Sequence, residues 1–197
     1  MGTGWQCGAY ERPANHLYEP DSGVPDSGSG HWRPEGGVFC TSSGSDSERK
    51  AEEGMSEVWE THTPEETWRL GYELGEKAGA KEVYCLDGDL GVGKTVFAQG
   101  FAAGLGIQES VNSPTFTIVQ EYDQGRLPFY HFDVYRIGDV EEMEEIGYED
   151  YFFGEGVCLI EWPSLISEIL PDTAVWVLIE KEMERGFDFR RICVKRP

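Results

Sequence analysis

Apolar positions along the chain fall into two patterns, short unbroken runs and runs with helical spacing. Unbroken runs such as residues 157–160, VCLI, are typical of buried β-strands. Leu70, Leu74 and Ala78 instead recur every four residues, as on one face of an α-helix. These patterns predict strands over residues 82–86, 115–122, 128–136, 156–162, 174–182 and 190–196, and helices over residues 64–78, 95–106, 139–152 and 164–170.

The first predicted helix carries signals for both of its ends. Thr63 and Glu66 form a capping box, and Pro64 takes the first helical position. Gly79 is suited to end the helix. We therefore expect ordered structure to begin near Ser56.

The order of the predicted elements indicates the fold class. Strands alternate with helices early in the chain, which is typical of a parallel sheet covered by helices. Two strands joined around residues 123–126, DQGR, predict a hairpin, and the last two strands predict another antiparallel pair. The sequence thus predicts an α/β three-layer fold with a mixed parallel and antiparallel sheet between helices.

Residues 1–55 differ in composition from the rest of the chain. They are rich in Gly, Ser, Pro and charge, and such a segment buries too little apolar surface to offset its ordering entropy. We predict a disordered tail over 1–55 and one folded domain over 56–197. Scattered aromatic residues give the tail a less favoured interpretation as a docking motif: Trp5, Tyr10, Trp32 and Phe39.

Charge limits the classes of ligand that the whole surface would attract. The chain has 37 Asp and Glu against 16 Lys and Arg, for a formal net charge of -21. A direct nucleic-acid binder presents a basic stripe to phosphates, and membrane surfaces are also anionic. The sequence has no such stripe and no apolar run near the roughly 18 residues of a spanning helix. It predicts neither direct nucleic-acid binding nor membrane association.

Cysteine usage and the N-terminus bear on the compartment. The five cysteines are odd in number and scattered, which predicts neither a disulfide framework nor a zinc site. Cys85, Cys158 and Cys193 fall in apolar runs, as expected of reduced core thiols. The N-terminus has no apolar signal-peptide core, and its acidic residues count against a transit peptide. The sequence therefore predicts a cytoplasmic protein.

One segment carries a specific chemical signal. Residues 88–95, GDLGVGKT, match the pattern G-x-x-x-x-G-K-[ST] between a predicted buried strand and a predicted helix. Glycines let successive backbone N–H groups point inward at phosphates, and the helix N-terminus adds its dipole. The predicted loop, with Lys94 for the β- and γ-phosphates and Thr95 for Mg²⁺, comprises Gly88, Asp89, Leu90, Gly91, Val92, Gly93, Lys94 and Thr95.

A nucleotide site of this kind needs an acidic residue on its metal side. Glu161 ends the apolar run VCLI, and Asp133 lies among aromatic residues in HFDVYR. Either carboxylate fits the role by sequence alone. His131 precedes Asp133 by two residues and would share its face of a strand, where a lone histidine is more often structural than catalytic.

The segment NSPTF, residues 112–116, lies between the predicted phosphate-loop helix and the hairpin. In P-loop switches, a Ser or Thr in such a segment senses the γ-phosphate and Mg²⁺, and Thr115 fits that role. Ser113 and Pro114 fit a simple turn equally well. Both interpretations remain open at this point.

Four motifs occur together in this chain: GDLGVGKT, SPTF, HFDVYR and EWP. In this order and at these separations, they closely resemble the TsaE (YjeE) family of bacterial P-loop ATPases. The likeness runs from about Ser56 to the end of the chain, so residues 56–197 are expected to be a P-loop ATPase domain. The first 55 residues lie outside it.

The resemblance implies a role for each matching position. It implies that residues 88–95 hold the phosphates of ATP, and that Thr95 and Glu161 ligate Mg²⁺. Further implied roles are Asp133 in hydrolysis, Thr115 in a switch-like loop, and Trp162 beside the site.

The resemblance also implies a pathway. Family members support the synthesis of N6-threonylcarbamoyladenosine next to the tRNA anticodon, with TsaD and TsaB as the transferase pair. They bind and hydrolyse ATP, and do not perform the transfer themselves. Partners that bind the tRNA would explain why this acidic chain needs no basic surface.

Two other functions compete with this one. A small P-loop kinase needs basic lid residues near the transferred phosphoryl group, but residues 138–156 contain no Lys or Arg. A nucleotide-gated binding module with incidental hydrolysis fits the SPTF segment as well. No N-K-x-D string is present, so guanine specificity has no support.

Overall fold

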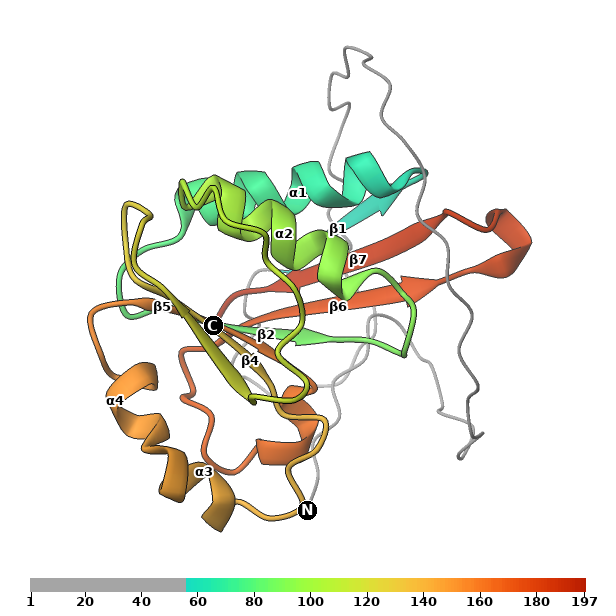
Figure 1. The fold of residues 1–197 in the computed structure, drawn as a ribbon. Coiled ribbons are helices and arrows are strands. Elements are labelled where there is room, and N and C mark those ends of the chain that lie inside the picture. The colour runs from blue at the N-terminus through green and yellow to red at the C-terminus, as the bar shows by residue number, and fades with distance from the viewer. Residues whose placement is uncertain (1–55) are drawn as a thin grey trace, which may run out of the picture. The chain divides into compact units, whose positions relative to one another are not determined.

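The computed structural model describes residues 56–197, so the predicted disordered tail over 1–55 lies outside the described residues. These residues form a seven-stranded sheet with the strand order β1-β7-β6-β2-β5-β4-β3 (Figure 1). The strands are β1 (Ser56–Thr61), β2 (Val83–Asp87), β3 (Val119–Tyr122), β4 (Phe129–Asp133), β5 (Val157–Glu161), β6 (Val175–Lys181) and β7 (Arg190–Lys195). The helices are α1 (Pro64–Lys77), α2 (Lys94–Gly104), α3 (Glu141–Ile146) and α4 (Tyr148–Phe152), with 3-10 turns η1 (Pro163–Ile166) and η2 (Met183–Arg185).

The sheet is mixed, as predicted. β6, β2, β5 and β4 are parallel neighbours at its centre. β7 and β1 extend one side in antiparallel pairing, and β3 adds an antiparallel edge on the other side. Helices α1 and α2 cover one face, and α3 and α4 lie on the opposite face (Figure 1). The prediction of a three-layer α/β P-loop fold with a mixed sheet is therefore confirmed.

Helix α1 begins where its sequence signals place it. The Thr63 side chain accepts a hydrogen bond from the Glu66 backbone N–H at 3.2 Å, and Pro64 is the first helical residue. The Glu66 side chain in turn accepts a hydrogen bond from the backbone N–H of His62 at 2.6 Å. At the other end, the Arg126 guanidinium donates to the carbonyls of Gly75, Glu76 and Ala78. The Gly75 carbonyl also accepts the backbone N–H of Ala78 at 3.3 Å.

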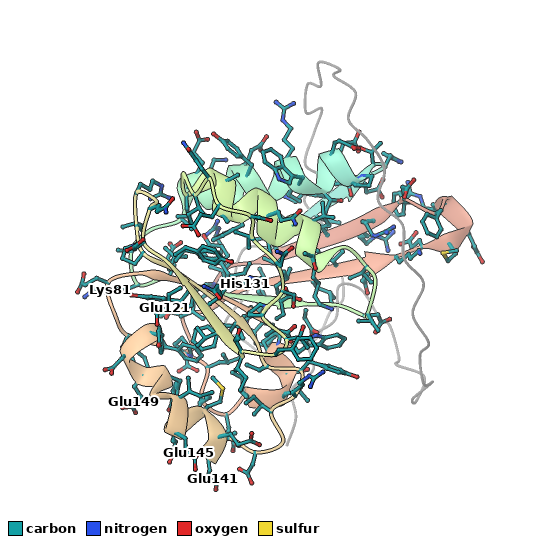
Figure 2. All side chains as sticks on the ribbon, in the orientation of Figure 1. Lys81, Glu121, His131, Glu141, Glu145 and Glu149 are labelled. Atoms are coloured by element: carbon teal, nitrogen blue, oxygen red, sulfur yellow. The ribbon has the colours of Figure 1, made fainter. Side chains whose placement is uncertain are left out.

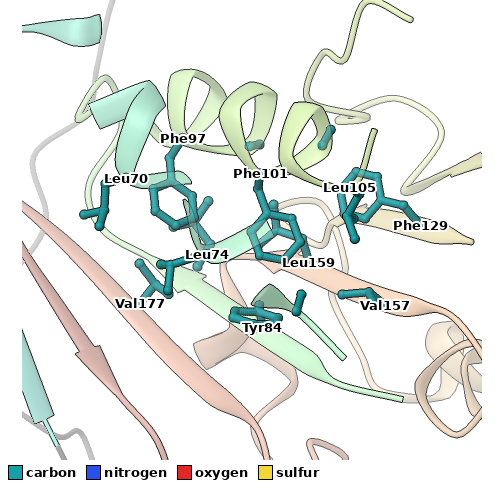
Figure 3. Close-up of a cluster of buried hydrophobic side chains, with 14 of the residues drawn as sticks. Leu70, Leu74, Tyr84, Phe97, Phe101, Leu105, Phe129, Val157, Leu159 and Val177 are labelled. Carbon is teal, nitrogen blue, oxygen red and sulfur yellow. The ribbon is translucent and has the colours of Figure 1, made fainter. Parts of the chain in front are cut away.

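Glycines let α1 and α2 approach closely. A Cβ on Gly75 of α1 would lie 2.0 Å from the Phe101 carbonyl oxygen, and one on Gly100 of α2 would lie 1.9 Å from the Trp68 carbonyl oxygen. Below this contact, Phe97 and Phe101 of α2 point into a core that includes Tyr84 of β2 (Figure 3). The packing fixes α2, and with it the loop at its N-terminus.

Several elements differ from their prediction, including the strand predicted over 128–136, which ends earlier, at Asp133. The helix predicted over 139–152 is two short helices, because Gly147 takes a left-handed conformation with φ 75°. The helix predicted over 164–170 is the shorter turn η1. Ser56–Thr61 is a strand that we did not predict, and it pairs with β7 from the far end of the chain.

The strand predicted over 115–122 starts later than expected, at Val119. The Pro114 carbonyl accepts bonds from the N–H groups of Thr117 and Ile118, and Ile118 has a φ of 67°. These contacts close a tight turn, so pairing with β4 begins only after it.

The buried thiols match their predicted place in the core. Cys85, Cys158 and Cys193 are each at most 2% exposed. Burial raises the pKa of the Cys158 thiol to about 12, so it stays protonated and unreactive near neutral pH. Among the described helices, none has the length and apolar character to cross a membrane.

Candidate functional site

The candidate site lies at the carboxyl ends of the central parallel strands. β2 ends at Asp87 just before the glycine-rich loop, and β4 and β5 end at Asp133 and Glu161, which are register partners. Parallel strands bring such ends to one edge of a sheet, where α/β proteins usually bind ligands. A cavity of about 400 Å³ opens at this edge, lined by Leu90, Gly91, Gly93, Lys94, Thr95, Ser113, Thr115, Asp133, Tyr135, Glu161 and Trp162.

The glycine-rich loop curls because three of its glycines have positive φ. Gly88, Gly91 and Gly93 have φ values of 142°, 75° and 102°. A Cβ on Gly91 or Gly93 would meet no atom within 4 Å, so the backbone faces open space there. No side chain in the described part of the chain caps α2 at Gly93. The first turn of α2 therefore presents its N–H groups and helix dipole to the cavity, which suits an anion.

Contacts from the opposite side hold the loop in place. Arg190 of β7 donates from Nε to the Val92 carbonyl at 2.6 Å, and the Val92 side chain is buried in the core. A Cβ on Gly88 would lie 2.4 Å from the Ile179 carbonyl oxygen of β6. The loop is thus packed against two strands through its backbone.

Lys94 is folded back onto the loop that carries it. Its Nζ donates to the carbonyls of Gly88 at 2.6 Å and Asp89 at 3.0 Å, and lies 3.7 Å from the centre of the Trp162 ring. The residue is only 6% exposed. Burial lowers the pKa of Lys94, and the negative charge of Glu161 is the largest of the effects that oppose this. A phosphate in the cavity would offer the ammonium group a charged partner in place of neutral carbonyls.

Asp133 connects the end of β4 to the segment before β3. Its Oδ2 accepts a bond from Thr115 Oγ1 at 2.6 Å and another from Ser113 Oγ, and its Oδ1 accepts from the Tyr135 backbone N–H at 3.1 Å. Asp133 is 3% exposed. The carboxylate therefore orients two hydroxyl groups that line the cavity.

Ser113 and Tyr135 line the cavity but were not among the predicted site residues. Ser113 was assigned only to a turn, and the turn is present as well, closed by the Pro114 carbonyl. The two interpretations of this segment are compatible, because the turn places both hydroxyls beside Asp133. The Ser-x-Thr spacing was the signal that could have identified Ser113.

Glu161 and Trp162 form the wall next to Lys94. Glu161 is 3% exposed, and its Oε1 lies 2.9 Å from His131 Nε2. Trp162 follows in a left-handed conformation with φ 63°, an uncommon one for a bulky side chain. This turn brings the indole against Lys94 and within 5.0 Å of the Tyr135 ring, centre to centre.

The predicted residues converge on this cavity with three exceptions in the loop. Gly88 and Asp89 do not line it, but offer their carbonyls to Lys94. Val92 faces the core. The Asp89 side chain is exposed to solvent and outside the cavity lining.

The donor atoms around the cavity suit Mg²⁺ bound together with phosphate. The described residues contain no group of three or more His, Cys, Asp or Glu able to hold a metal alone. Mg²⁺ commonly takes one or two carboxylates, with phosphate and water completing an octahedron of oxygens. Glu161, Asp133 and the hydroxyls of Thr95 and Thr115 supply such oxygens along one cavity.

Comparisons with known proteins agree on one family. The family model described as "Threonylcarbamoyl adenosine biosynthesis protein TsaE" matches residues 61–191. The chain is 50% identical over 134 residues to the tRNA threonylcarbamoyladenosine biosynthesis protein TsaE of Bacillus subtilis (strain 168), covering 68% of this chain and 82% of that protein. It is 41% identical over 117 residues to TsaE of Treponema pallidum (strain Nichols), covering 59% of this chain and 86% of that protein.

A solved structure supports the same assignment. The crystal structure of Bacillus subtilis YdiB superposes with a TM-score of 0.64 at 40% sequence identity, covering 74% of this chain and 88% of that chain. The family match includes the glycine-rich loop, Asp133 and Glu161. The chain therefore belongs to the TsaE family of tRNA threonylcarbamoyladenosine biosynthesis proteins.

Proposed function

We propose that this chain binds ATP with Mg²⁺ in the cavity and hydrolyses it slowly, in support of threonylcarbamoyl transfer to tRNA. The main support is one juxtaposition. The glycine-rich loop, the N-terminus of α2, a buried lysine and two buried carboxylates surround a single cavity of about 400 Å³. Backbone amides and one lysine bind anions locally, so the net charge of -21 does not oppose a polyphosphate ligand here.

The side of the cavity formed by the glycine-rich loop, residues 88–95, would hold the triphosphate. Loop N–H groups around Gly91 and Gly93 contact the phosphates, and Lys94 leaves the carbonyls of its own loop for the β- and γ-phosphates. Thr95 and Glu161 would hold Mg²⁺. When bound, the ion would neutralise charge on the phosphate oxygens.

The other side of the cavity, formed by Ser113, Thr115 and Asp133, would control hydrolysis. Asp133 holds Thr115 and Ser113 through hydrogen bonds, so it fixes where these hydroxyls stand relative to a bound γ-phosphate. Thr115 would act as the switch residue and change partners when the γ-phosphate is present. We expect Asp133 to matter for hydrolysis more than for binding.

Slow turnover follows from the residues that the cavity lacks. No arginine is among the lining residues of the described chain. Arg136 is nearby in sequence, but its guanidinium stacks over the exposed Phe116 ring at 4.5 Å. An arginine supplied in trans contributes roughly 10³ to 10⁵ in rate in other P-loop enzymes. A site without one would stay loaded until a partner completes or reshapes it.

We infer that TsaD and TsaB are the partners and that tRNA contact is indirect. Family membership supports the pathway, and the acidic surface supports docking onto a basic face. Glu141, Glu145 and Glu149 project from α3 and α4 (Figure 2), where residues 138–156 carry no base. The same observation counts against a small kinase, which needs cations near the transferred group.

Binding and pull-down experiments test the proposal. ATP titrated calorimetrically into the full chain should bind with Mg²⁺ present, and Lys94→Ala should abolish or weaken the heat signal. The tagged chain incubated with cell extract should retain TsaD and TsaB, and ATP should change the amount retained. Absence of ATP binding would refute the nucleotide site. Binding without any hydrolysis, alone or with partners, would favour the nucleotide-gated binding module.

A further inference from the structure

A buried histidine contacts the carboxylate proposed to hold the metal ion. His131 of β4 is 0% exposed, and its Nε2 lies 2.9 Å from Oε1 of Glu161, which is 3% exposed. Asp133 and Glu161 are register partners on adjacent parallel strands. His131 pairs with Leu159, two residues earlier on each strand. Side chains alternate along a strand, so His131 lies on the same face as both carboxylates. Figure 2 shows it in the interior of the domain.

The hydrogen-bond arrangement fixes which nitrogen donates. An ionised Glu161 can only accept, so Nε2 carries the proton that joins the two groups. Nδ1 has no hydrogen-bond partner among the described residues. A proton there would leave a buried donor unsatisfied, which is costly, so Nδ1 is the unprotonated nitrogen. His131 is therefore oriented toward Glu161 and toward no second polar group in residues 56–197.

Packing holds the imidazole ring in this orientation. The Phe129 ring, two residues earlier on β4, lies nearly parallel to it at a centre-to-centre distance of 5.9 Å and an interplanar angle of 19°. Glu161 has three side-chain torsions and sits at the last position of β5, where the strand gives way to the Trp162 turn. A bond from a fixed ring to Oε1 restricts these torsions and leaves Oε2 as the oxygen available to a ligand in the cavity.

We propose that His131 is a positioning residue that orients Glu161 for Mg²⁺ bound with the nucleotide. The proposal rests on the proposed function, because it needs Glu161 to be a metal ligand. Hydrogen-bond partners of metal-binding groups commonly contribute 10- to 100-fold in metal affinity. A histidine that merely fills the core would affect stability without affecting metal affinity selectively.

The test measures Mn²⁺ affinity of the full chain saturated with a non-hydrolysable ATP analogue, from the free Mn²⁺ signal in electron paramagnetic resonance. His131→Leu removes the donor, and we expect Mn²⁺ affinity to fall by about 10- to 100-fold. His131→Gln keeps a donor at a similar reach and should recover most of the loss. Binding of the analogue without metal should change less than threefold in both variants.

Two controls separate positioning from a general structural effect. Phe132→Leu perturbs the opposite, equally buried face of the same strand, and should lower the thermal midpoint without changing Mn²⁺ affinity. The double variant His131→Leu with Glu161→Ala should bind Mn²⁺ no more weakly than Glu161→Ala alone, because His131 acts through Glu161.

Each outcome has a distinct meaning. If Glu161→Ala weakens Mn²⁺ binding but His131→Leu does not, or if the two losses add, the positioning role is wrong and the proposed function stands. If Glu161→Ala leaves Mn²⁺ binding intact, the metal site of the proposed function is wrong. If His131→Leu fails to fold, His131→Gln still tests the proposal: a 10-fold loss of Mn²⁺ affinity overturns it.

Discussion

The two sides of the cavity are held by different kinds of contact. On the loop side, residues 88–95 are fixed through their backbone by Arg190, by the approach of Gly88 to β6 and by Val92 in the core. On the other side, the Ser113 and Thr115 side chains are held by hydroxyl bonds to one carboxylate. Backbone packing cannot change without disturbing the core, whereas two side-chain bonds can exchange partners. We infer that the loop side binds and that the opposite segment responds.

The largest expected effect is on the loop side. Arg190→Ala leaves the carbonyls of Val92, Phe187 and Phe189 without their donor, and two of these three bonds are buried. We expect the free energy of unfolding to fall by about 3 kcal/mol, since each buried unsatisfied carbonyl costs about 1–3 kcal/mol. Urea denaturation measures this. Arg191→Ala on the same strand is the matched control, and an equal loss in both variants would contradict the special role of Arg190.

The second-largest expected effect is on the affinity for ATP. Lys94→Ala removes the one cationic side chain of the loop, and the affinity for ATP should fall at least about tenfold, or about 1.4 kcal/mol. Lys94→Met, which keeps a long apolar side chain without the charge, separates charge from packing and should show the same loss. An unchanged dissociation constant in both variants would mean that the nucleotide binds elsewhere.

Substitutions of Asp133 and Thr115 should affect ATP hydrolysis more than ATP binding. Asp133→Ala and Thr115→Val should spare ATP binding within about threefold and lower single-turnover hydrolysis at least tenfold, because only the positioning of the hydroxyls is lost. Glu161→Ala should instead weaken Mg²⁺-dependent binding. If Asp133→Ala weakens binding and Glu161→Ala spares it, the two carboxylates have exchanged roles.

The smallest expected effect concerns residues 1–55, for which the sequence predicts disorder. If the predicted disorder is right, deletion of residues 1–55 should shift the thermal midpoint by no more than about one or two degrees, because a disordered segment would contribute little burial. Differential scanning calorimetry of the full and shortened chains measures this. A large loss of stability or of ATPase activity would mean that these residues pack on the domain.

The difference between the two sides also explains what the sequence could predict. The loop was identifiable because its chemistry is local: glycines, Lys94 and Thr95 stand within eight residues of one another. The end of β5 followed from the apolar run VCLI, which stops at Glu161, whereas the strand predicted over 128–136 ends earlier than expected, at Asp133. Parallel pairing then places Asp133 beside Glu161, although 28 residues separate them in the chain.

Other features depend on contacts between residues that are far apart in the sequence. Ser113 became a site residue only through its bond to Asp133, and Arg190 through a carbonyl 98 residues away. The strand β1 exists because the outer edge of β7 is available for pairing. The pattern over 139–152 was helical throughout, and only the left-handed conformation at Gly147 breaks it in two.

We propose that the nucleotide site stays loaded and depends on a partner for turnover. Steady-state phosphate release at saturating ATP and Mg²⁺, for the chain alone and with TsaD and TsaB, tests it most directly. We expect release slower than about one per second for the chain alone, below the median of about 10 per second for enzymes, and a changed rate with the partners. Faster release by the chain alone, unaffected by added partners, would show a self-sufficient enzyme and contradict the claim.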